Sequence, residues 1–150
     1  MRGRRGFSFI ELLVAMIFIG LLARLAVPRY ADMKRRAVAA SIIGDVHTIR
    51  LAAFTYYTEF GSFPPDAADG TLPAQLVSSL PDGFTFDRPD YDYDWHVWTV
   101  VNGGSTETLV GVTVTVADSR LIPRLVLAAG AGYIPIVTTS KITFLVTRAS

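Results

Sequence analysis

The chain has 150 residues, which is enough for one compact core of ordinary domain size. Its 14 Lys and Arg residues against 13 Asp and Glu residues give a formal net charge of +1, so a strongly basic surface that would attract nucleic acid is not indicated. The absence of cysteine excludes a disulfide framework, a thiolate metal site and a cysteine nucleophile.

The N-terminal part of the chain contains an apolar run of membrane length. It extends from Phe7 to Val27 and contains two ionisable residues, Glu11 and Arg24. A carboxylate inside a bilayer costs about 2.5 to 3.5 kcal/mol and therefore calls for a partner. Arg24 lies about 20 Å away along a helix, too far to pair with Glu11. The partner must come from another molecule, or the carboxyl group must be neutral.

The residues around this run resemble a known processing signal. A short basic leader ends at Gly6, and Phe7-Ser-Phe-Ile-Glu11 opens the apolar run. This combination resembles the N-terminal signal of the type IV pilin superfamily, which includes the pilins of type IV pili and the pseudopilins of type II secretion. The resemblance covers about 28 residues and is specific, because leader, glycine, Phe, Glu and apolar run must all coincide.

The resemblance implies particular roles for five residues. A prepilin peptidase would cut after Gly6 and methylate the new N-terminus at Phe7. Glu11 would attract the N-terminal amine of a neighbouring subunit during assembly, which would supply the missing partner. Gly20 and Pro28 fall where family members often carry helix-loosening residues, and Pro28 also lacks an amide hydrogen, so we expect a kink or local loosening there.

Two ordinary alternatives exist for the same stretch, an uncleaved signal anchor and a secretory signal peptide. A secretory peptide has an apolar core of about 7 to 15 residues, and this run is longer and contains Glu11. Basic residues flank the run on both sides, so the cytoplasmic placement of the N-terminus is taken from the resemblance. We expect a leader at residues 1–6, a transmembrane assembly helix at 7–28 and a globular head at 29–150.

Residues 30–60 keep a helical apolar spacing beyond the membrane run. The spacing predicts one stripe packed on a sheet, formed by Ala31, Val38, Ile42, Val46, Ile49, Ala53, Tyr57 and Phe60. Gly61, Pro64 and Pro65 are expected to end this helix. The stretch from Tyr56 to Pro64 also resembles the tyrosine-rich helix end of pseudopilins and related small pilins.

The rest of the chain reads as a small sheet with short connections. Residues 66–90 connect helix to sheet through one short helix. Period-two alternation predicts strands at 91–101, 109–116, 133–137 and 142–147, the first two forming an antiparallel hairpin. Asp118 or Ser119 should cap a short helix running to about Ala129. The fold class is therefore α+β, with a long N-terminal helix, transmembrane in its first half and amphipathic in its second, packed on a small antiparallel sheet.

Four aspartates near the first strand raise the question of calcium: Asp87, Asp90, Asp92 and Asp94. A calcium site needs six to eight converging oxygens, whereas alternate residues of one strand only share a face. We predict a solvated strand face with no metal and no cofactor. Trp95 and Trp98 fall on opposite faces, which favours core packing over an aromatic platform for sugars or bases.

No pattern indicates an enzyme. His47 and His96 are the two histidines, and the sequence has no phosphate loop and no nucleophile elbow. A membrane-anchored enzyme would require a polar cleft that the sequence does not reveal. We therefore predict a protein without catalytic activity.

The resemblance implies a structural subunit of a type IV pilus or type II secretion pseudopilus. It would sit in the inner membrane with its head on the extracytoplasmic side, and later in a filament in the periplasm or on the cell surface. Its partners would be the prepilin peptidase, other pilins or pseudopilins, membrane lipid and the assembly platform, without nucleic acid. The alternative is a minor or tip pilin whose head binds DNA, a surface or a secreted substrate. A retained Glu11 argues mildly against a tip pseudopilin.

Overall fold

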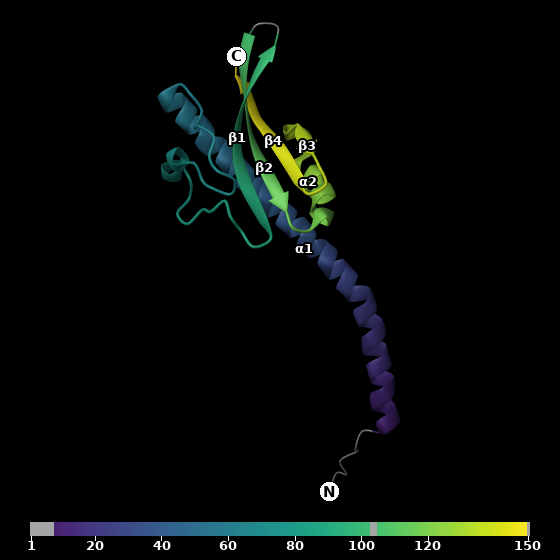
Figure 1. Cartoon of the computed structure of the whole chain (residues 1–150). Coiled ribbons are helices and arrows are strands. Elements are labelled where there is room, and N and C mark those ends of the chain that lie inside the picture. The colour runs from purple at the N-terminus through teal and green to yellow at the C-terminus, as the bar shows by residue number, and fades with distance from the viewer. Residues whose placement is uncertain (1–7, 103–104, 150) are drawn as a thin grey trace. The chain divides into compact units, whose positions relative to one another are not determined.

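The computed structural model describes residues 8–102 and 105–149 (Figure 1). The chain divides into two compact units, Met1–Arg35 and Arg36–Ser150. Helix α1, Phe9–Phe60, contributes to both. In the second unit it packs on a small four-stranded antiparallel sheet, so the predicted α+β class with a long N-terminal helix is confirmed.

Helix α1 is continuous from Phe9 to Phe60, and neither Gly20 nor Pro28 ends it. Its last turn closes where the sequence predicts, because Gly61 adopts a positive φ of 72° and donates its N–H to the Tyr57 carbonyl at 2.8 Å. A kink at Gly20 or Pro28 stays a prediction.

The buried side of α1 agrees with the predicted stripe at four of its eight residues, Ile42, Val46, Ile49 and Ala53. The buried residues are Ala39, Ile42, Val46, Ile49, Ala52 and Ala53. Tyr57 and Phe60 were predicted to extend this stripe, and that prediction is wrong: they are 38% and 59% exposed. Their rings instead stack on aromatic neighbours at the helix end, Tyr57 on Phe63 at 4.6 Å and Phe60 on Tyr56 at 4.4 Å between centroids.

The sheet contains β1 Tyr91–Asn102, β2 Ser105–Val116, β3 Pro135–Val137 and β4 Lys141–Ala149, in the order β1-β2-β4-β3. β1 and β2 form the predicted hairpin, with Trp95 opposite Val112. β2 begins earlier than predicted because residues 105–108 pair with the far end of β1. β4 pairs with both β2 and the short edge strand β3.

Short helices complete the head. The connection before β1 holds the 3-10 helix η1, Ala74–Ser79, and the chain after β2 forms η2, Ser119–Leu121, followed by α2, Ile122–Ala129, and η3, Gly130–Gly132. Asp118 caps this second group, since its side chain accepts the Arg120 N–H at 3.1 Å. The cap and the end near Ala129 match the sequence-based expectation.

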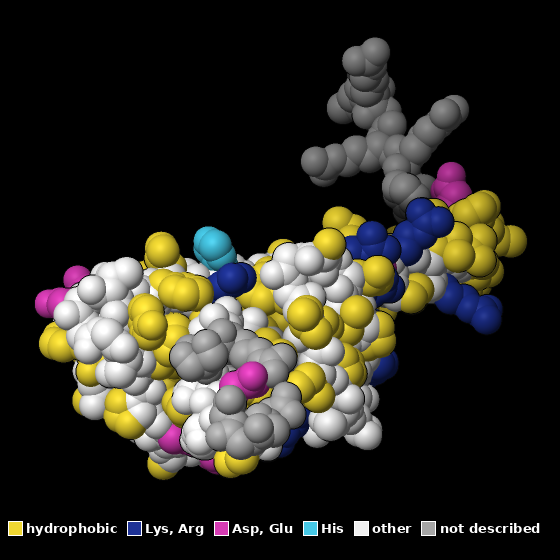
Figure 2. Space-filling model, turned by 90° about the horizontal axis from the view of Figure 1, so that it is seen from above, with side chains coloured by type: hydrophobic (Ala, Val, Ile, Leu, Met, Phe, Trp, Pro, Cys, Tyr) yellow, Lys and Arg dark blue, Asp and Glu magenta, His cyan; other side chains and the backbone are white. Residues whose placement is uncertain are grey.

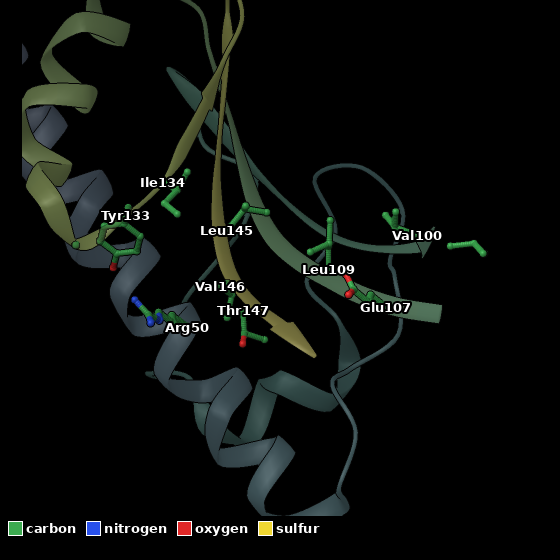
Figure 3. Close-up of a pocket in the computed structure, with 11 residues that line it drawn as sticks. Arg50, Val100, Glu107, Leu109, Tyr133, Ile134, Leu145, Val146 and Thr147 are labelled. Atoms are coloured by element: carbon green, nitrogen blue, oxygen red, sulfur yellow. The ribbon is translucent and has the colours of Figure 1, made fainter. Parts of the chain in front are cut away.

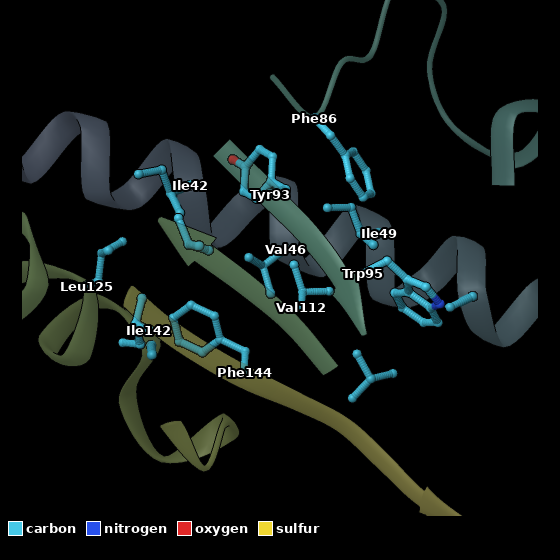
Figure 4. Packing of buried hydrophobic residues seen from close by; sticks show 14 of the residues in the cluster. Ile42, Val46, Ile49, Phe86, Tyr93, Trp95, Val112, Leu125, Ile142 and Phe144 are labelled. Atoms are coloured by element: carbon cyan, nitrogen blue, oxygen red, sulfur yellow. The ribbon is translucent and has the colours of Figure 1, made fainter. Parts of the chain in front are cut away.

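The core lies between α1 and the inner face of the sheet (Figure 4). Its largest fully buried side chains include Trp95, Tyr93, Phe86, Phe144, Ile42, Ile49 and Leu125. The Trp95 indole N–H donates to the Pro64 carbonyl at 3.1 Å, so the polar end of this core residue is satisfied. Core packing of Trp95 is therefore confirmed, whereas Trp98 is 36% exposed.

A polar network joins α1 to β1 at one end of this core. The fully buried Tyr93 hydroxyl donates to the Asp45 carboxylate at 2.8 Å, and the Arg88 guanidinium lies 3.3 Å from the same oxygen. Arg88 also lies over the rings of Phe84 and Tyr91, at 5.7 and 5.8 Å from their centroids. Burial, and then the hydrogen bond to Asp45, raise the pKa of the Tyr93 phenol far above its usual range.

The packing predicts how two residues of α1 differ in their contribution to stability. Ile49 is fully buried and Leu51 is 62% exposed. Ile49→Ala should lower the free energy of unfolding of the head by about 2 to 5 kcal/mol, and Leu51→Ala by less than about 0.5 kcal/mol. Denaturant unfolding of the full chain in detergent, followed by tryptophan fluorescence, measures this because both tryptophans lie in β1. Equal losses for the two variants would contradict the packing of α1 on the sheet.

The buried phenol predicts a loss of stability in alkali. The folded head keeps Tyr93 protonated, whereas the unfolded chain releases this proton above about pH 10. The contribution of the protonated Tyr93 phenol to the free energy of unfolding is therefore complete below pH 10 and is lost as pH rises. The free energy of unfolding should then fall by up to about 1.4 kcal/mol per pH unit. Tyr93→Phe should lose about 1 kcal/mol at neutral pH but remove this slope. Urea unfolding between pH 8 and 11 tests it, with Tyr57→Phe as a control that keeps the slope.

Candidate functional site

The N-terminal part of α1 is an apolar helix whose membrane-length stretch has no buried residue among the residues that the structure describes. It is long and apolar enough, by length and composition, to cross a membrane, and its best 18-residue window has a mean hydropathy of 2.4 with none of the window buried. Figure 2 shows hydrophobic side chains crowded at this end of the molecule, with Lys and Arg side chains beside them. The exposed residues include Phe9, Ile10, Met16, Ile17, Phe18, Ile19, Leu22 and Leu25. Such a surface requires a bilayer or other apolar helices around it.

Glu11 lies in the first turn of this helix and caps it. One carboxylate oxygen, Oε2, accepts the Ser8 N–H at 3.1 Å, and the Leu12 N–H donates to the Ser8 carbonyl at 3.2 Å. This is the glutamate half of a capping box, which satisfies an N–H group that the helix itself leaves unpaired. The role was missed in the sequence, although Ser8 and Glu11 have the S-x-x-E spacing that signals it.

The other predicted site residues differ in what the structure says of them. Gly6 and Phe7, the predicted cleavage and methylation positions, lie outside the described residues. Gly20 lies in open space, because a Cβ added there would meet nothing within 4 Å in the described part of the chain. Pro28 lies inside α1. Neither residue has an intramolecular packing role that would explain it.

The aspartates of β1 are not uniformly solvated. Asp94 is only 4% exposed, and its Oδ1 accepts the Gly70 N–H, so the prediction of a solvated strand face is wrong for this residue. The physical reason is that the chain after α1 folds beside β1 and covers this carboxylate. Burial, and then the charges of Asp87 and Asp94, raise the pKa of Asp92 above its usual range. His96 lies beside this group, with its Nδ1 3.7 Å from the Asp66 carboxylate.

A separate cavity of about 660 Å³ opens at the far end of the sheet (Figure 3). Apolar side chains of β1, β2 and β4 line it together with Tyr133 and Ile134, and Arg50 and Glu107 stand at its sides. No histidine and no carboxylate pair is found among its described lining residues. The lining is therefore mainly apolar, with one basic and one acidic side chain at its sides.

Comparisons with known proteins identify the kind of chain. The fimbrial protein of Pseudomonas aeruginosa is 34% identical over 53 residues, which cover 35% of this chain and 34% of that protein. The type IV major pilin protein PilE of Neisseria gonorrhoeae is 33% identical over 63 residues, 42% of this chain and 38% of that protein. The fimbrial protein EcpC of Eikenella corrodens is 31% identical over 73 residues, 49% and 48% of the two chains. Over these stretches the chain is similar to proteins of the type IV pilin superfamily.

These matches bear on the sequence-based expectations in different ways. The match to this chain spans about a third to half of the length of these pilins and fimbrial proteins. No protein-family model and no solved structure matches the chain. The predicted resemblance to the type IV pilin superfamily is thus confirmed over these stretches, and the names of these relatives describe filament proteins rather than enzymes. A pseudopilus, N-terminal processing and a tip-binding role stay predictions.

Proposed function

We propose that the chain is a structural subunit of a type IV pilus, made as a membrane-anchored precursor and polymerised through the N-terminal part of α1. The observation that carries this proposal is the exposed apolar helix of α1 with a single carboxylate in its first turn, on a chain related to major pilins. The relatives named as pilins favour a pilus over a secretion pseudopilus. Before assembly, this helix would hold the subunit in the inner membrane with the head outside.

Polymerisation would give the apolar helix the surroundings it lacks. Neighbouring copies of α1 can pack side by side, so the exposed side chains of each are covered by the next, as lipid covers them before assembly. Glu11 is the one acid of α1 between Phe9 and Val27, and the described residues place no Lys or Arg against it. A carboxylate in apolar surroundings requires an opposite charge, and the amine of a processed Phe7 on the next subunit would supply it.

Processing gives the first test. In cells with their own prepilin peptidase, the membrane-extracted protein should lack residues 1–6 and carry one methyl group on Phe7. Intact mass and N-terminal sequencing measure both changes. An intact Met1, or cleavage near Val27, would contradict the proposal and indicate a signal anchor or a secretory signal peptide instead.

Charge at position 11 gives the second test. Glu11→Gln keeps an oxygen that can accept the Ser8 N–H but removes the charge, so the helix cap survives while pairing with an amine is lost. We expect the variant to reach the membrane with a folded head and to yield no filaments. Sheared-filament yield and tryptophan fluorescence measure the two properties.

The matched control for this variant is Glu59→Gln, which changes an exposed glutamate in the last turn of the same helix. It should assemble normally. Normal filaments from Glu11→Gln would show that position 11 acts through its hydrogen bond alone, and would overturn the charge-pairing part of the proposal.

A further inference from the structure

Three side chains from two separate segments of the head converge beside β1. Asp94 and His96 occupy alternate positions of β1 and therefore point to the same face, and Asp69 comes from the chain that follows α1. One ligand atom of each lies within 4.8 Å of the others. From this geometry we propose a binding site for a divalent first-row transition-metal ion, with Zn²⁺ as the ion that it fits.

The surroundings of Asp94 give an independent reason for a cation here. Its side chain is 96% removed from solvent, since its exposed fraction is 4%. The described residues give it one hydrogen bond, from the neutral Gly70 N–H to Oδ1, and no ion pair with Lys or Arg. Buried carboxylates are normally paired with a cation or coordinate a metal, because burial of an unpaired charge is costly. A bound cation would therefore balance the charge of the buried Asp94 carboxylate.

The neighbouring charges favour a cation over an anion. A hollow of about 450 Å³ adjoins the three ligands, and the acidic side chains that line it are Asp69, Asp87, Asp92 and Asp94. Lys141 also lines the hollow and opposes this field, but within the described residues no ion pair joins it to Asp94. Clustered acids of this kind concentrate cations locally.

The ligand set fits zinc better than calcium. Calcium takes six to eight oxygen ligands, whereas zinc binds both imidazole and carboxylate ligands, and three protein ligands leave its fourth position open. Zinc bonds of about 2.0 to 2.2 Å place tetrahedral ligand atoms about 3.3 to 3.6 Å apart. The ligand atoms here lie within 4.8 Å, so inward rotation by about an ångström closes the site. Asp69 is exposed and His96 is partly exposed, which leaves an entry path for the ion. The Nδ1 of His96 also lies 3.7 Å from the Asp66 carboxylate, a contact that a turn of the ring toward the ion would change.

A bound ion would tie the chain after α1 to the first strand of the sheet. That connection runs from Gly61 to β1 and holds no α-helix, so its position depends on contacts such as the Trp95–Pro64 and Asp94–Gly70 hydrogen bonds. Metal binding to the folded head alone would raise its stability by mass action. This inference does not rest on filament assembly, and it concerns the head whether or not the chain polymerises.

The test uses the full chain in detergent, prepared without a polyhistidine tag and freed of metal by a chelator. Zn²⁺ alone is titrated in competition with a chromophoric chelator, and thermal unfolding is followed by tryptophan fluorescence with and without Zn²⁺. We expect one Zn²⁺ per chain and a higher Tm in its presence. His96→Ala and Asp69→Ala should each weaken binding at least tenfold and remove the rise in Tm.

The chain contains its own control in His47→Ala, which removes the other histidine, exposed on α1. This variant should bind Zn²⁺ as the unchanged chain does. Asp94→Asn is measured only if its fluorescence shows a folded head, because Asp94 is buried. Absence of Zn²⁺ binding, loss of binding in His47→Ala with retention in His96→Ala, or equal binding of Ca²⁺ would each overturn the proposal.

Discussion

The fold of the head depends on the burial of one side of α1 against the inner face of the sheet. Ile42, Val46 and Ile49 recur at helical spacing and are fully buried, and they meet β-strand residues that recur at every second position. The two periodicities bring together rows of side chains that are far apart in the sequence. The remaining parts of the head cover the ends of this contact: α2 contributes Leu125, and the connection before β1 contributes Phe86.

The same helix changes character along its length. From Arg36 onward its apolar residues form a stripe, and the opposite side is polar. Between Phe9 and Val27 almost every side chain is apolar, so apolar surface surrounds the helix there. One sheet can bury an apolar stripe, whereas a helix that is apolar on all sides is fully buried only when other molecules or lipid surround it. The head therefore completes its own packing, while the N-terminal part leaves its apolar surface to surroundings outside the chain. This division fits the proposed function, in which the chain is first anchored in the membrane and then polymerised.

Local signals predicted most of the elements, and long-range contacts account for the errors. The spacing of apolar residues and the positions of turn-forming residues correctly predicted the end of α1 at Gly61, the β1–β2 hairpin and the cap at Asp118. Helical spacing gave the correct face for Val46 but could not report where the sheet beneath it ends, so Phe60 was assigned to the core although it is exposed. The burial of Asp94 depends on Gly70, 24 residues earlier, and strand alternation carries no information about such a covering segment. The ligand group with Asp69 was missed for the same reason.

In the proposed filament, Glu11 would serve both its own helix and the assembly. Its Oε2 accepts the Ser8 N–H, which fixes the first turn of α1 within the single chain. A carboxylate has two oxygens and about four positions at which it accepts hydrogen bonds, so this contact leaves most of its capacity and its full charge available. The cap also holds the carboxylate at the helix N-terminus, next to the position where a processed chain would begin. Because the cap already restrains this side chain, it would lose little conformational entropy when the amine of a second subunit pairs with it. An acid that rotates freely would lose more entropy on pairing, so its pairing with an amine would be less favourable.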